Sequence, residues 1–234
     1  MSEEEKNQDL QAPAGRAYGL IVDFDYTVVD GITLLQDVAT KALSSAGATV
    51  LPVTFTRKLF GFKTVSAIKG LLGPASRTST ESVVSTIAGS MDQAIECAPM
   101  NAWVLDVCQK AMAEGVRVVF VTARSLALVE EKLGASGFAD APVIKVERCE
   151  RFGEYAVDAW ERAARVIGMS PRVCSVIAAT AMSIRQAMMA GMRTVAVINP
   201  IISFQDFSGS DIIVEKSDVA SASAKVLAWV IPEN

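Results

Sequence analysis

Shortly after its start, the chain reads Tyr18-Gly19-Leu20-Ile21-Val22-Asp23-Phe24-Asp25-Tyr26-Thr27. The apolar part of this stretch is short and ends at an acidic turn, which is typical of a buried parallel strand. In an open parallel sheet, ligands bind at the carboxyl ends of the strands. We therefore expect Asp23 and Asp25 to lie at a ligand-binding edge.

The rest of the chain alternates short apolar runs with helical patterns. Runs rich in β-branched residues predict further strands at 116–121, 142–146, 173–178, 194–198 and 211–214. Helical patterns occupy 102–114, 125–136, 153–167, 182–190 and 217–230. Strands that alternate with helices form a parallel sheet with right-handed crossovers. The pattern therefore predicts an α/β protein with a doubly wound parallel sheet.

Residues 31–100 break this alternation. They show helical patterns and no convincing buried strand, and they are far more numerous than a plain crossover requires. We expect an inserted helical cap at 31–100 and an α/β core made of 16–30 and 101–234. Residues 1–15 are polar and acidic, so we expect a mobile tail there.

Composition excludes several classes of protein. The chain has no histidine, which rules out Ser-His-Asp and Cys-His mechanisms. Its four cysteines form no CxxC pair, so a zinc site is not expected. A net charge of −4 argues against a nucleic-acid binder, and no apolar run is long enough to span a membrane. Without a secretory signal, and with scattered cysteines, we expect a cytoplasmic protein.

The Asp23-Phe24-Asp25 motif suits phosphoryl transfer. Asp23 could attack phosphorus as a nucleophile, and a protonated Asp25 could protonate the leaving oxygen and later activate water. The competing interpretation is a polar turn that caps a helix. The position of the motif, directly after an apolar strand and before a helical insert, favours the catalytic interpretation.

These residues resemble the first motif of the haloacid-dehalogenase-like (HAD-like) superfamily, in which DxDx(T/V) follows an apolar strand. The second family motif, an apolar strand ending in Thr or Ser, is similar to Val118-Val119-Phe120-Val121-Thr122. The segment 167–197 resembles the C-terminal half of the family, and the nearest branch is that of phosphoglycolate phosphatase and β-phosphoglucomutase. The resemblance implies a Rossmannoid core with a helical cap.

The resemblance also implies roles for particular residues. Asp23 and Asp25 would be catalytic, and Thr122 and Ala123 would bind the phosphate of a small phosphorylated molecule. Mg²⁺ would bind Asp23 and the main-chain carbonyl of Asp25. In the cap, Lys63 could reach a substrate, although a solvated lysine at a helix N-terminus fits as well.

The chain departs from the family in its third and fourth motifs. Ala179 stands where the main metal-binding acid is expected, and Ala178 and Ser183 stand where other branches place a second acid. The third-motif lysine aligns with Glu154. Three nearby cations could substitute for it only with a shift in alignment: Lys145, Arg148 and Arg151.

The missing cations weaken the expected catalysis. At ~4 Å and an effective dielectric constant of about 20, Asp23 and each unit of phosphate charge repel by roughly 4 kcal/mol. Mg²⁺ and the lysine normally offset this repulsion. For Arg124, which follows Thr122, a surface ion pair and a phosphate contact both fit the sequence.

Three hypotheses remain open from the sequence. The first is a phosphohydrolase that acts on a small phosphorylated metabolite through an aspartyl-phosphate intermediate, with weakened activity. The second is an inactive relative that serves as a binding or scaffold subunit, either in a homo-oligomer or in a larger complex. The third is a metal-free haloacid dehalogenase, in which Asp25 would have no purpose.

Overall fold

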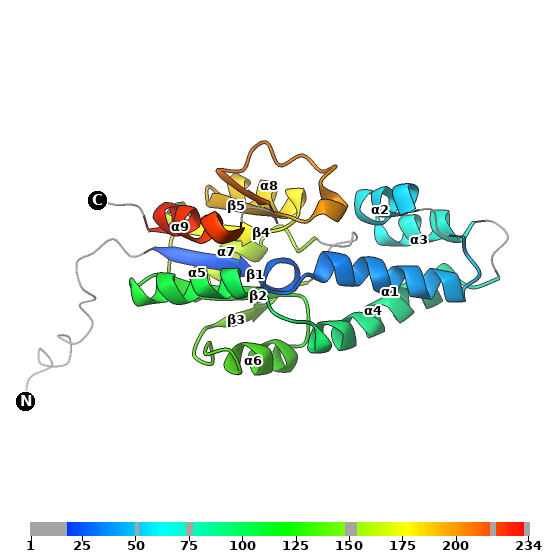
Figure 1. Ribbon diagram of the computed structural model, residues 1–234, viewed down its shortest axis with the longest axis horizontal. Coiled ribbons are helices and arrows are strands. Elements are labelled where there is room, and N and C mark those ends of the chain that lie inside the picture. Colours follow the sequence, from blue (N-terminus) through cyan, green and yellow to red (C-terminus); the bar gives the residue numbers. More distant parts are fainter. Residues whose placement is uncertain (1–17, 50–51, 74–76, 148–153, 216–218, 232–234) are drawn as a thin grey trace, which may run out of the picture.

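The sheet of this protein is parallel and has six strands (Figure 1). A computed structural model describes residues 18–49, 52–73, 77–147, 154–215 and 219–231. The strand order is β3-β2-β1-β4-β5-β6. The strands are β1 (Gly19–Asp23), β2 (Arg117–Thr122), β3 (Val143–Lys145), β4 (Cys174–Ala178), β5 (Arg193–Ile198) and β6 (Ile212–Glu215). The prediction of a doubly wound parallel sheet is confirmed.

Strand β1 lies inside the sheet, between β2 and β4, and all of its residues are buried. Its apolar side chains belong to the main hydrophobic core, which is why an uninterrupted apolar run forms this strand. Asp23 is paired with Val121 of β2, and Val22 is paired with Ile177 of β4. Asp23 therefore leaves the sheet beside Val121 on one flank and Ala178 on the other.

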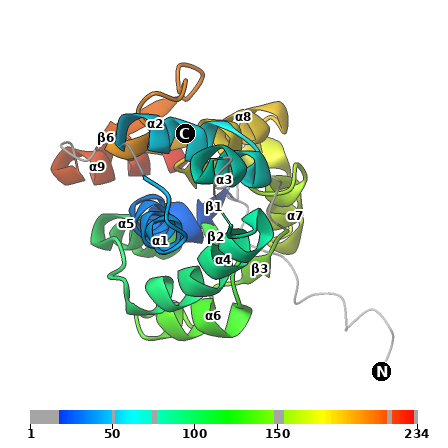
Figure 2. The same cartoon turned by 90° about the vertical axis from the view of Figure 1, so that its right-hand side faces the viewer.

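Helices cover both faces of the sheet. Figure 2 shows α5 and α9 on one side of the strands and α7 and α8 on the other. The helices of the core are α5 (Ala102–Ala113), α6 (Leu126–Gly134), α7 (Ala159–Val166), α8 (Ala181–Met189) and α9 (Val219–Val230). None of the helices in the described ranges is both long and apolar enough to cross a membrane.

Helix α7 begins later than the sequence pattern predicted. The predicted helix covered 153–167, but the residues that lead to Ala159 are not helical from Glu154 onwards. The backbone N–H of Ala156 donates instead to the carbonyl of Glu147, at 3.0 Å. This bond holds the segment in a non-helical path beside the carboxyl end of β3.

Four helices occupy the range predicted for the cap and project beyond the strand ends, on the right of Figure 1. They are α1 (Gly31–Ser45), α2 (Pro52–Gly61), α3 (Thr64–Leu72) and α4 (Thr80–Cys97). Helices α1 and α4 pack together through apolar residues at helical spacing. These residues are Leu35, Ala39 and Leu43 on α1 and Ile87, Met91 and Ile95 on α4.

The two chain segments that join these helices to the sheet are tied to each other. Val29 and Met100 form an isolated antiparallel bridge. The backbone N–H of Asn101 donates to the carbonyl of Val28 at 2.7 Å, and its side-chain amide donates to the carbonyl of Thr27 at 3.3 Å. The chain therefore enters and leaves the four helices at one paired crossing.

Candidate active site

The aspartate pair sits at the start of a short π-helical turn, η2 (Phe24–Val28), that directly follows β1. Asp23 caps this turn, because its Oδ1 accepts from the backbone N–H of Tyr26 at 3.1 Å. The hydroxyl of Thr27 donates to the carbonyl of Asp23. π-Helical turns are rare in proteins overall, but those that occur are often found at functional sites. The turn holds both Asp23 and Asp25 fully out of solvent.

Gly31 fits closely against this turn. A Cβ atom at Gly31 would lie 2.1 Å from the carbonyl oxygen of Asp25, which no side chain could tolerate without movement of the backbone. A glycine is therefore required where α1 begins, because the helix starts in contact with the turn. The carbonyl it contacts is the one that the family resemblance assigned to metal binding.

On the β2 flank, three donors surround the carboxylate of Asp25. The hydroxyl of Thr122 donates to Oδ1 at 2.5 Å, and the backbone N–H of Ala123 donates to Oδ2 at 3.0 Å. The guanidinium Nε of Arg124 lies 3.6 Å from the same Oδ2. Thr122 and Ala123 were predicted to bind phosphate, so an internal carboxylate occupies the donors expected to face a ligand.

Arg124 forms an ion pair, but a buried one and not the surface pair considered from the sequence. Its side chain is only 2% exposed, and its Nη1 lies 3.2 Å from Oδ1 of Asp92 on α4. Burial opposes the charge on the guanidinium, but Asp25 and Asp92 outweigh it, and the pKa of Arg124 is raised. Arg124 is therefore a fixed positive charge between the sheet and the projecting helices.

Asp23 has a partner that the sequence alignment missed. The hydroxyl of Tyr155 donates to Oδ1 of Asp23 at 2.6 Å. Spacing had matched the third family motif to Glu154, and the residue that reaches the site is the next one along the chain. Its aromatic ring is fully buried and lies 6.1 Å from the ring of Tyr26 and 5.7 Å from that of Trp160.

Burial is the main influence on the pKa values of Asp23 and Tyr155. It raises the pKa of Asp23 well above its usual range, and the charge of Asp25 raises it further, while the bonds from Tyr155 and Tyr26 act in the opposite direction. Burial and then Asp23 raise the pKa of Tyr155, so its hydroxyl remains a proton donor. Oδ2 of Asp23 is buried without a hydrogen-bond partner in the described part of the chain.

The β4 flank of β1 is apolar where the family places acids. Ala178 is level with Asp23, and Ala179, one residue further, is 1% exposed. The hydroxyl of Thr180 accepts from the backbone N–H of Ser183 at 3.2 Å and donates to its Oγ at 3.0 Å. Thr180 and Ser183 thus cap the N-terminus of α8, which is a structural role.

No family model matches this sequence, and no curated protein matches it. Solved structures do. CbbY from Rhodobacter sphaeroides, in complex with phosphate, superposes with a TM-score of 0.62 at 14% identity, over 87% of this chain and 99% of its own. A HAD family hydrolase from Deinococcus radiodurans R1, with bound phosphate and sodium, gives a TM-score of 0.65 at 12% identity, over 93% and 99%. A β-phosphoglucomutase from Clostridium difficile gives 0.60 at 12%, over 91% and 99%.

This chain has the HAD-like fold. The architecture that the resemblance implied, a Rossmannoid core with a helical cap, is thereby confirmed. At such low identity the likeness establishes architecture, and the chemistry of the site has to be argued from its own residues.

The described side chains of this site leave only one carboxylate oxygen for Mg²⁺. Mg²⁺ requires near-octahedral oxygen ligands, of which proteins usually supply one or two carboxylates. Asp25 is committed to Thr122, Ala123 and Arg124, and Ala179 supplies no oxygen from its side chain. Across the ranges that the structure describes, no group of three or more acidic or cysteine residues could hold a metal ion. A single carboxylate oxygen, Oδ2 of Asp23, is left over.

Two other cations predicted for this site, Lys63 and Lys145, are exposed. Lys63 is exposed at the N-cap position of α3. Lys145 is exposed on β3, which β2 separates from β1, so its backbone is about 10 Å from that of Asp23. It lines a pocket of about 490 Å³ that also contains Ala123 and Arg162. Arg148 and Arg151 lie outside the described residues.

Proposed function

We propose that this chain is a HAD-like protein that binds an oxyanion of a small phosphorylated molecule between its core and its helical cap without hydrolysing it. Such a protein would act as a binding or scaffold subunit. The observation that supports this proposal is the chemical difference between the two flanks of β1. The donors of Thr122, Ala123 and Arg124 converge on a carboxylate on one flank, while Ala179 stands on the other flank where metal chemistry needs an acid.

Oxyanion binding is supported by the nature of the donors on the β2 flank. A hydroxyl, a backbone N–H and a guanidinium are the groups that bind phosphate oxygens in proteins. They already hold one oxyanion, the carboxylate of Asp25, in a site that excludes water. Because Asp25 retains Thr122 and Ala123, an incoming phosphate group would bind the guanidinium of Arg124, whose other partner, Asp92, is half-exposed.

The absence of turnover is supported by electrostatics. Attack by Asp23 on a phosphate dianion would bring like charges together at roughly 4 kcal/mol for each unit pair. The donors at Asp23 itself are Tyr155 and the backbone of Tyr26, and both are neutral. With so few ligands for Mg²⁺, Arg124 is the cation that, among the described residues, pairs with this aspartate site and could offset the charge that develops in the transition state.

A second candidate is a weak phosphohydrolase that uses Asp23 as nucleophile and Asp25 as acid and base. One observation favours it: Oδ2 of Asp23 makes no hydrogen bond within the described part of the chain, so a carboxylate oxygen is available for attack. This candidate predicts slow hydrolysis that disappears in Asp23→Asn.

The two candidates separate in a phosphatase assay of the full chain with p-nitrophenyl phosphate, with and without Mg²⁺. The proposed function predicts that the wild type and Asp23→Asn hydrolyse at the same background rate under both conditions. Mg²⁺-dependent hydrolysis that Asp23→Asn abolishes would refute it and establish the second candidate.

A gain-of-function variant tests whether the missing acid on the β4 flank prevents metal binding. Ala179→Asp restores an acid beside Asp23, and we expect it to bind Mn²⁺, measured by electron paramagnetic resonance, where the wild type does not. Thr180→Ser, at the adjacent position, keeps the native chemistry and is the matched control. Equal Mn²⁺ binding by wild type and Ala179→Asp would contradict the role given to Ala179.

A further inference from the structure

Arg124 belongs to the core but also contacts the cap. It follows β2, and its guanidinium is 3.6 Å from Asp25 at the end of β1 and 3.2 Å from Asp92 on α4. Asp25 and Asp92 come from the two parts of the molecule that the paired crossing joins. One buried cation therefore serves a carboxylate from each part.

The two carboxylates differ sharply in exposure. The side chain of Asp25 is 0% exposed, whereas that of Asp92 is 50% exposed. Separating Asp25 from Arg124 would leave a buried charge without its partner, which is strongly unfavourable. Asp92 can turn into water at little cost, because a half-exposed carboxylate is already largely hydrated. Asp92 is therefore the exchangeable partner of Arg124.

The guanidinium has donor capacity that its present contacts do not use. Its Nε faces Oδ2 of Asp25 at 3.6 Å, and its bond to Asp92 runs through Nη1, so that a single N–H donor serves the exposed carboxylate. A guanidinium can offer two parallel N–H donors to one oxyanion, which gives a stronger contact than a single bond. A phosphate group could thus bind Arg124 better than the Asp92 carboxylate does.

We infer that the carboxylate of Asp92 occupies the place at Arg124 that an incoming oxyanion takes, so that binding of a phosphate group breaks the link between Arg124 and α4. Arg124 then acts as the residue that senses the ligand, and Asp92 as an internal competitor. The inference rests on the proposed function, since it names the cap residue that a bound phosphate displaces. Coupling of this kind is reciprocal: the Asp92 contact weakens phosphate binding, and phosphate weakens the hold on α4.

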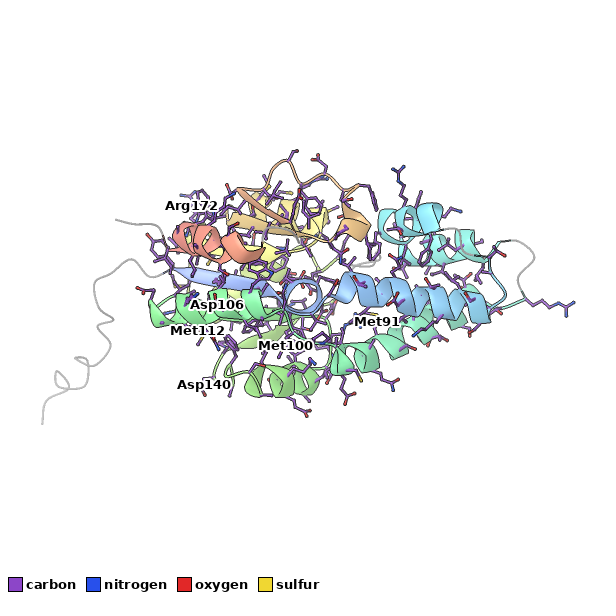
Figure 3. The ribbon with its side chains drawn as sticks, viewed as in Figure 1. Met91, Met100, Asp106, Met112, Asp140 and Arg172 are labelled. Atoms are coloured by element: carbon purple, nitrogen blue, oxygen red, sulfur yellow. The ribbon has the colours of Figure 1, made fainter. Side chains whose placement is uncertain are left out.

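The experiment compares Asp92→Asn with Asp106→Asn. Both substitutions replace an aspartate by asparagine and so change the net charge equally. Each also removes one carboxylate from an ion pair, since Asp106 pairs with Lys110 at 2.7 Å. Asp106 lies on α5, far from Met91, the neighbour of Asp92 on α4 (Figure 3). The probe is inorganic phosphate, titrated against the full chain by calorimetry.

We expect Asp92→Asn to bind phosphate at least about fivefold more tightly than the wild type does. Asp106→Asn should match the wild type, and Arg124→Gln should lose binding. Equal affinities of Asp92→Asn and Asp106→Asn would overturn the inference. If no variant binds phosphate, both the inference and the proposed binding function fail. Hydrolysis of a phosphate ester by the wild type would refute only the latter.

Hydrogen exchange provides a readout that a merely structural role for Arg124 would not move. Phosphate should increase exchange of the backbone amides in α4 of the wild type and leave α5 unchanged. In Asp92→Asn, where the carboxylate at Arg124 is already absent, phosphate should leave the exchange of α4 unchanged. Protection of α4 by phosphate in the wild type would contradict the proposed displacement.

Discussion

The two flanks of β1 differ in their chemistry although they are equivalent in geometry. On the β2 side, Thr122, Ala123 and Arg124 direct donors at the carboxylate of Asp25. On the β4 side, Ala178 and Ala179 present methyl groups, and the next polar residues cap a helix. Both flanks are carboxyl ends of neighbouring parallel strands, where the fold allows a site.

This difference teaches that recognition and chemistry are separable in this architecture. Anion-binding donors come from the strand on one side of the nucleophile position, and metal-binding acids would come from the strand on the other side. Because the two sets lie on different strands, substitutions at the β4 end can remove catalysis and leave the donors of the β2 end in place.

The largest effect on stability is expected from removing the cation of the β2 flank. Arg124→Gln leaves the buried charge of Asp25 without its counter-ion, and we expect the free energy of unfolding to fall by about 3 kcal/mol. Lys110→Gln is the control, since it removes the cation of an exposed pair, 56% and 41% exposed, and should change stability by less than about 0.5 kcal/mol. Urea denaturation measures both, and equal losses would show that burial gives the Arg124 pair no special weight.

Measurements of stability as a function of pH test the environment of Asp23, which lies between the two flanks. The folded pKa of Asp23 is raised above the ordinary value of 3.8, mainly by burial. Between pH 3.8 and that raised pKa, the native chain therefore keeps on Asp23 a proton that the unfolded chain has lost, and the contribution of Asp23 to stability falls as pH rises. Asp23→Asn cannot titrate, so its stability relative to the wild type should increase with pH in this window, by up to about 1.4 kcal/mol per pH unit.

Thermal or urea unfolding of both proteins from pH 4 upwards gives the difference curve. Carboxylates that do not interact with Asp23 titrate alike in both proteins and cancel. A stability difference between Asp23→Asn and wild type that stays constant with pH would mean that Asp23 ionises normally in the folded chain.

The smallest effect is expected on the β4 flank. Thr180→Ala removes the cap of α8 and should lower the free energy of unfolding by about 1 kcal/mol. Thr180→Ser keeps the hydroxyl and should remain close to the wild type. Neither variant should change phosphate affinity in calorimetry, because the proposed binding donors lie on the other flank. A loss of phosphate affinity in Thr180→Ala would show that the β4 flank contributes to the ligand site.

The sequence was sufficient for those parts of the site that depend on local pattern and on strand ends. An apolar run that stops at Asp23 predicts the strand, and the family resemblance assigned Thr122 to the same site, where it lies beside Asp25 although 97 positions separate them. The family resemblance assigned Ala179 to the same edge. The position of the aspartate pair itself needs only the strand pattern and the rule that ligands bind at the carboxyl ends of parallel strands.

The sequence was insufficient where a contact depends on the path of a loop or on the packing of the cap. Tyr155 reaches Asp23 across 132 positions because the segment before α7 is not helical, and the helical pattern hid that path. The partner of Arg124 could not be predicted either, because Asp92 meets it only when α4 packs over the end of β2. Neither contact has a local signature in the sequence.

The paired crossing at Val29 and Met100 also bears on how the cap can move. A body attached through two adjacent segments turns about a single axis near them, and displacement grows with distance from that axis. Asp25 sits in the turn beside the axis, so its contact with Thr122 should hardly change during such a rotation. Asp92 lies further out along α4, so a few degrees of swing would be enough to separate it from Arg124.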